Sequence, residues 1–132
     1  MKHNINILGR YLQYPAYEEV LHYIRDLSWD ERLDATSVIK GIGTRFHRYY
    51  SIIQLGDHIM SSNAYLMNGG GLDFKKGGLV FWLRHAIGDQ PLADAVEKAE
   101  GVFQIEADAR DAIFMILEAR ITQYREVLEA SG

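Results

Sequence analysis

The sequence predicts an all-α fold, a single compact helical domain of about six helices that spans residues 1–132. The length is typical of one domain, and 48% hydrophobic residues are enough to build a core. Apolar residues recur at spacings of three and four along most of the chain, and no segment shows the alternation expected of a strand. These observations together favour helices throughout.

The N-terminal half is expected to form three helices. Pro15 suits the first turn of a helix that runs to about Leu27. Ser28–Glu31, "SWDE", is a capping box, and the helix that it opens should end at Gly41–Gly43. Thr44–Met67 is then predicted to be one long helix with Phe46 and Tyr50 on its apolar side.

The C-terminal half contains the strongest helical pattern in the chain. The apolar run 79–87, "LVFWLRHAI", fits either a short buried helix or a buried strand. Asp89 and Pro91 mark the start of a helix, and Gly101 is expected to break or kink it. Ala107–Glu129 is predicted to be a long helix that packs against Thr44–Met67.

Charge is divided unevenly along the chain, which has a net charge of −4. Residues 40–88 contain six Lys and Arg residues against two acidic ones, whereas residues 89–132 contain ten acidic residues against four basic ones. In "TRFHRYY", residues 44–50, arginines and aromatic side chains interleave, as they do in surfaces that anchor protein partners or stack bases. The predicted partner-binding residues are Arg45, His47, Arg48, Tyr49, Lys75, Lys76 and Arg84.

The glycine-rich stretch "MNGGGLDFKKGG", residues 67–78, fits no phosphate-binding motif. A Walker loop requires a lysine and a hydroxyl residue directly after its last glycine, and neither is present. We favour chain turns at both ends, with Leu72 and Phe74 as apolar anchors between them. Whether residues 68–78 form a binding loop or only a turn stays open.

No motif indicates catalysis, a metal or a cofactor. The chain has no cysteine, which excludes thiolate chemistry and disulfides. Glu19 and His22 form a single E-x-x-H pair, half of what a di-iron bundle needs. Asp57 and His58 are adjacent and should point to different helix faces, which argues against a base and its orienting carboxylate.

We therefore expect a non-catalytic protein that binds another protein, of the inhibitor, immunity or accessory-subunit type. The alternative is a small helical subunit of a nucleic-acid-binding complex that contacts the backbone through the basic middle segment. A homo-oligomer is also compatible with the sequence. The absence of cysteine and of any long apolar run predicts a cytoplasmic location away from membranes.

Overall fold

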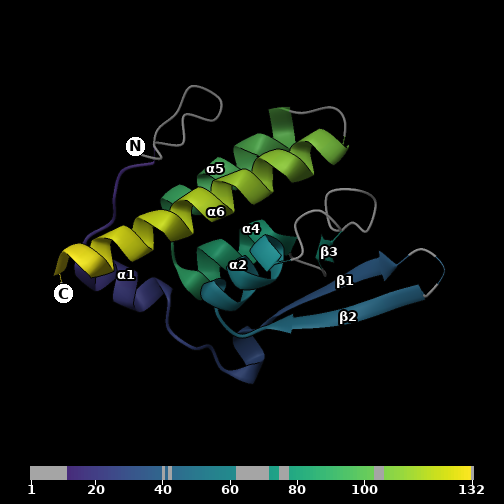
Figure 1. Cartoon of the computed structure of the whole chain (residues 1–132), viewed down its shortest axis with the longest axis horizontal. Coiled ribbons are helices and arrows are strands. Elements are labelled where there is room, and N and C mark those ends of the chain that lie inside the picture. The colour runs from purple at the N-terminus through teal and green to yellow at the C-terminus, as the bar shows by residue number, and fades with distance from the viewer. Residues whose placement is uncertain are drawn as a thin grey trace.

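The computed structural model describes residues 12–39, 41, 43–61, 72–74, 78–102 and 106–131. These residues are mostly helical, but they include a small antiparallel sheet that lies below the helices in Figure 1. The all-α prediction with about six helices is therefore wrong. The described residues form five α-helices and a three-stranded sheet, a mixed α and β architecture.

Helix α6 (Glu106–Ser131) is the scaffold on which the other helices pack. α5 (Gln90–Val102) lies along it, and α1 (Tyr17–Tyr23) and α2 (Ile52–Ser61) also contact it (Figure 1). The predicted C-terminal helix is thus confirmed, and so is its contact with a helix from the middle of the chain.

The core fills the space between these helices. Its fully buried apolar side chains include Val20, Ile52, Leu55, Leu83, Ile87, Leu92, Ile116, Leu117 and Ile121. α2 approaches α6 closely at Gly56, where an added Cβ would lie 2.3 Å from Ile121 Cδ1. A larger residue at position 56 would therefore force this contact to shift.

Strands β1 (Leu33–Ile39) and β2 (Gly43–Tyr49) form an antiparallel hairpin whose tip extends away from the helices (Figure 1). The short strand β3 (Asp73–Phe74) pairs with the other side of β1. The order β2-β1-β3 leaves β2 at the edge of the sheet.

The predicted helix that starts at Ser28 is wrong, although its capping box forms. The Ser28 N–H donates to Glu31 Oε1 at 3.2 Å, but the box closes only one 3-10 turn, η1 (Trp29–Glu31). The next residues alternate, with Leu33, Ala35 and Ser37 buried. An inward side chain at every second position fits a strand, whereas a helix would turn Ala35 away from the face that Leu33 and Ser37 share.

The predicted helix Thr44–Met67 is half right. Gly41 and Gly43 have φ values of +83° and +121°, and they turn the hairpin. Residues 43–49 then form β2, and α2 begins only after Ser51, whose Oγ accepts the Gln54 N–H at 3.0 Å. Residues 62–67 lie outside the described residues.

The apolar run 79–87 is helical, which settles the alternative that the sequence leaves open. α4 (Gly78–Trp82) continues into a π-helical turn, η3 (Leu83–Ile87). α5 starts directly after Asp89, as predicted, and ends one residue beyond Gly101.

Only part of the glycine-rich stretch is described. Leu72 is buried and Phe74 packs against the core, so both predicted apolar anchors are confirmed. The remaining positions of the loop, Lys75 and Lys76 among them, lie outside the described residues. Within the described part of the chain, no helix combines the length and the apolar character needed to cross a bilayer.

Candidate partner-binding surface

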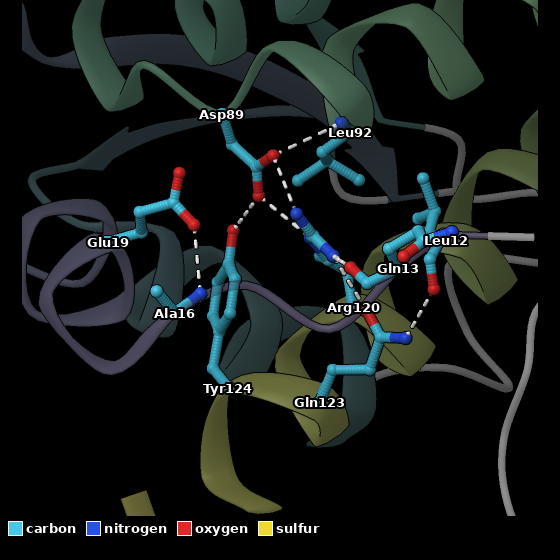
Figure 2. Close-up of polar contacts among 9 residues, drawn as sticks. All are labelled: Leu12, Gln13, Ala16, Glu19, Asp89, Leu92, Arg120, Gln123 and Tyr124. Carbon is cyan, nitrogen blue, oxygen red and sulfur yellow. Dashed lines mark hydrogen bonds and ion pairs between the residues drawn. The ribbon is translucent and has the colours of Figure 1, made fainter. Parts of the chain in front are cut away.

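The densest polar cluster, which we call the Asp89 network, is buried against α6. Arg120 donates from Nε to Asp89 Oδ2 at 2.8 Å and from Nη2 to Asp89 Oδ1 at 2.9 Å, and the Tyr124 hydroxyl also donates to Oδ2 (Figure 2). Asp89 Oδ1 accepts the Leu92 N–H at the start of α5 as well. One carboxylate therefore caps α5 and neutralises a buried arginine.

The same network holds the N-terminal segment. Arg120 Nη1 donates to the Gln13 carbonyl at 2.7 Å and to Gln123 Oε1 at 2.8 Å, while Gln123 Nε2 donates to the Leu12 carbonyl at 2.8 Å (Figure 2). Burial, and then the negative charge of Asp89, raise the pKa of Tyr124, which keeps its hydroxyl protonated. Since all these side chains are buried and paired, the network is structural rather than a binding site.

The second candidate is the outward face of the β1–β2 hairpin together with Trp29. We call it the hairpin face and define it by Trp29, Arg32, Val38, Phe46 and Arg48. Phe46 lies opposite Thr36, and Arg48 lies opposite Asp34. Phe46 is 76% exposed and Trp29 is 53% exposed. The prediction that Phe46 faces the core is wrong, because in a strand it points away from its buried neighbours.

Two guanidinium groups cover the Trp29 ring. The Cζ of Arg32 lies 3.7 Å from the ring centroid, and the Cζ of Arg48 lies 5.1 Å from it. Arg32 is also held by Asp34, whose Oδ1 accepts from Nε at 3.0 Å. These contacts orient both arginines at the base of the hairpin and restrict access to the indole faces.

β2 presents a free strand edge and a basic surface. It is exposed from Gly43 to Phe46, and no strand among the described residues pairs with its outer side. It contains Arg45 and Arg48 and no acidic residue, and neither arginine has an acidic partner in the described part of the chain. Such an edge carries backbone N–H and C=O groups that can pair with another strand.

His47 and Tyr49 lie on the inner face, where they attach the hairpin to α2. Ser37 Oγ lies 2.7 Å from His47 Nε2, and the Tyr49 hydroxyl lies 2.5 Å from His58 Nδ1. The two imidazole rings are 4.7 Å apart. Because Ser37 is 3% exposed, it cannot meet a substrate as a nucleophile. We interpret this inner cluster as support for the hairpin.

The surroundings of both histidines favour the neutral ring. Burial lowers the pKa of His58. Burial lowers the pKa of His47 as well, and the positive charges of His58 and Arg45 lower it further. Burial raises the pKa of Tyr49 far above its ordinary value, so this hydroxyl stays protonated. The cluster is therefore uncharged at neutral pH.

The remaining predicted positions are not part of the hairpin. Arg84 lies on η3 and braces α5, with Nη1 2.8 Å from Asp94 Oδ1 and Nη2 3.2 Å from Glu97 Oε1. Asp57 pairs with Arg125 at 3.3 Å while His58 contacts Tyr49, so the two neighbours do diverge as expected. No described group of three or more His, Cys, Asp and Glu side chains is arranged to hold a metal ion.

Sequence reasoning missed Trp29 and Arg32 on the surface, and it missed the Asp89 network in the core. A signal for the network was present, because Arg120 falls within the apolar stripe of α6, four residues before Tyr124. A charged residue in such a stripe indicates a buried partner. Comparison with known protein families, with curated proteins and with solved structures finds no match for this chain.

Proposed function

We propose that this protein acts without catalysis and binds an extended, acidic segment of another protein along the outer edge of β2. The observation that carries this proposal is the seven-residue strand β2, which is an exposed edge strand among the described residues. An added strand would form main-chain hydrogen bonds with this edge, as in other cases of strand addition. Inhibitors, immunity proteins and accessory subunits all fit this kind of contact.

Charge defines the chemistry of the partner. Arg45 and Arg48 are both exposed on β2, and their side chains leave the strand on opposite faces. Phe46 between them supplies an exposed aromatic surface. An extended segment that places carboxylates on both sides of its backbone would meet both arginines, and such charge complementarity favours association and specificity.

The same residues argue against two other partners for the edge of β2, a second copy of this chain and a nucleic acid. Two copies of β2 paired edge to edge would bring four arginines onto one short ladder, where like charges repel. A nucleic acid would stack successive bases on several open aromatic faces, but Arg32 and Arg48 cover the Trp29 ring, which leaves Phe46 as the exposed ring on β2. A protein segment needs the backbone edge rather than the indole ring.

The test uses a synthetic peptide, about as long as β2, in which pairs of glutamates alternate with pairs of valines, so that carboxylates lie on both faces of the extended chain. We expect saturable binding in calorimetry. N-methylation of alternate residues should abolish it, because the methylated peptide cannot donate to the edge. A lysine version should bind much more weakly. The double variant Arg45→Glu with Arg48→Glu should lower the affinity for the glutamate peptide by about tenfold or more.

Lys98→Glu with Arg125→Glu is the matched charge control, because both residues are exposed on α5 and α6, outside the hairpin. It should leave the peptide affinity unchanged. Equal binding of the N-methylated peptide would exclude strand addition. Preferential binding of single-stranded DNA, with a steep loss as salt rises, would instead support the nucleic-acid alternative. If the protein self-associates and Arg45→Glu strengthens that association, the partner of the β2 edge would be a second copy of this chain.

A further inference from the structure

A pocket between β3, α4 and the facing ends of α5 and α6 has no role in the proposed contact. Its volume is about 450 Å³, which lies within the range of small-molecule sites. The lining residues are mainly apolar: Leu72, Phe74, Leu79, Ala109, Ile113 and Phe114. A pocket of this size with an apolar wall can enclose the body of a small organic molecule.

Arg110 is the polar group that distinguishes this pocket. Its side chain lines the cavity, and its Nε is buried without a hydrogen-bond partner. No ion pair among the described residues includes it. An anionic acceptor that meets the Arg110 guanidinium from the cavity would form a charge-assisted hydrogen bond, which is stronger than an ordinary one.

Two acidic residues also line the pocket, and their positions differ. Asp73 pairs with Thr36 across the strands and is exposed, so water screens its charge. Glu100 is exposed as well and lies near the end of α5, where partial burial and then the charge of Glu97 raise the pKa of its carboxyl. Among the described residues, no ion pair joins Glu100 to Arg110.

We propose that this pocket binds a small monocarboxylic acid with an apolar body, whose carboxylate pairs with the guanidinium of Arg110. The apolar body would lie against Leu79, Ile113 and Phe114. An apolar cation fits less well because Arg110 would repel it, and a neutral alcohol would leave the charge of Arg110 without a counterion. This site is separate from the edge of β2, so either proposal can fail alone.

The test titrates the full chain with octanoate and with 3-phenylpropanoate, and compares octanoate with octanol and octylamine. We expect one saturable site for at least one acid, and a melting temperature that rises with its concentration. Octanol and octylamine should bind at least about tenfold more weakly. The absence of saturable binding for both acids would overturn the proposal, and so would equal binding of octanol or tighter binding of octylamine.

Variants locate the site. Arg110→Met should weaken binding of the acid by at least about tenfold, while Arg125→Met on the same helix should leave it unchanged. Ala109→Leu should fill part of the cavity and weaken both the acid and the alcohol. A melting curve of each variant checks that it folds. Unchanged affinity for the acid in folded Arg110→Met would place any binding elsewhere and refute the assignment.

Discussion

The Asp89 network and the hairpin face use similar side chains in opposite ways. In the network, Arg120 and Tyr124 surround one carboxylate, and every member is buried and paired. On the hairpin face, Arg48 and Trp29 contact each other but remain at the surface. An arginine beside an aromatic ring can therefore stabilise the fold or bind a partner. Its burial and its other partners decide between these two roles.

The difference also assigns separate tasks to the two regions. The network ties the chain at residues 12–13 and the start of α5 to α6, so its loss should affect the whole fold. The strands β1 and β2 extend beyond the helices (Figure 1), and their core residues Leu33, Ala35 and Tyr49 lie near the end that adjoins the helices. Changes at the exposed positions of β2 should alter contacts with a partner while leaving the fold intact.

The largest effect is expected for Asp89→Ala. It would leave the Arg120 guanidinium buried without its counterion, and it would remove the cap of α5. We expect a loss of about 3–5 kcal/mol in the free energy of unfolding, measured by urea denaturation. Asp94→Ala is the matched control, because Asp94 pairs with Arg84 at the surface and its loss should cost less than about 1 kcal/mol. Equal losses would show that the network is not the stabilising element.

A slightly smaller effect is expected for Ile116→Ala. Ile116 is fully buried on α6, whereas its neighbour Met115 is 55% exposed. The cavity left by the isoleucine should lower the free energy of unfolding by about 2–4 kcal/mol. Met115→Ala should change it by less than about 0.5 kcal/mol. Similar urea midpoints for the two variants would mean that α6 packs through a different face.

A third prediction concerns pH and the inner cluster under the hairpin. The pKa values of His47 and His58 are lowered in the folded protein. Below the ordinary pKa of histidine, the unfolded chain therefore binds protons at these two residues more readily than the folded protein does. The cluster therefore stabilises the fold fully above about pH 6.5, and this contribution should decline over the acidic interval below that pH.

The double variant His47→Gln with His58→Gln should show a smaller decline over that interval. Melting temperatures of the parent and the variant, measured across it, provide the comparison. The prediction would be contradicted if the parent protein became more stable on acidification and the variant did not. That result would show that the histidines gain protons on folding.

The smallest effect on stability is expected for the double reversal Arg45→Glu with Arg48→Glu. Both side chains are exposed; Arg48 loses its contact with Trp29, and the glutamate that replaces it lies opposite Asp34, which adds a modest like-charge repulsion. The free energy of unfolding should fall by no more than about 1 kcal/mol, as measured by urea denaturation. A loss as large as that of Asp89→Ala would mean that the hairpin face is part of the stabilising structure.

Long apolar stripes made the helices predictable, whereas the hairpin was missed. α6 repeats its buried positions over many turns, so its pattern is unambiguous. In the segment from Leu33 to Tyr49 burial alternates, but the inward positions include Ser37 and His47, so the sequence shows no apolar alternation. A capping box precedes the segment, and Phe46 and Tyr50 share a helical spacing. Pairing between β1 and β2 decides its structure, and this long-range contact overrides the local signals.

The candidate surface was predictable only in part, for the same reason. Arg45 and Arg48 were selected for their charge, and both are exposed on β2. His47 and Tyr49 were selected with them, but alternation along the strand turns these two towards α2. Trp29 joins the surface only through the fold, because η1 brings its ring beside Arg48.

The central claim is that a partner segment pairs with the outer edge of β2, and amide exchange tests it most directly. Hydrogen exchange would be followed by NMR with and without the valine–glutamate peptide. We predict slower exchange at alternate residues of β2 when the peptide is bound, with little change in α5 and α6. Unchanged exchange along β2, or new protection confined to α5 and α6, would contradict the account.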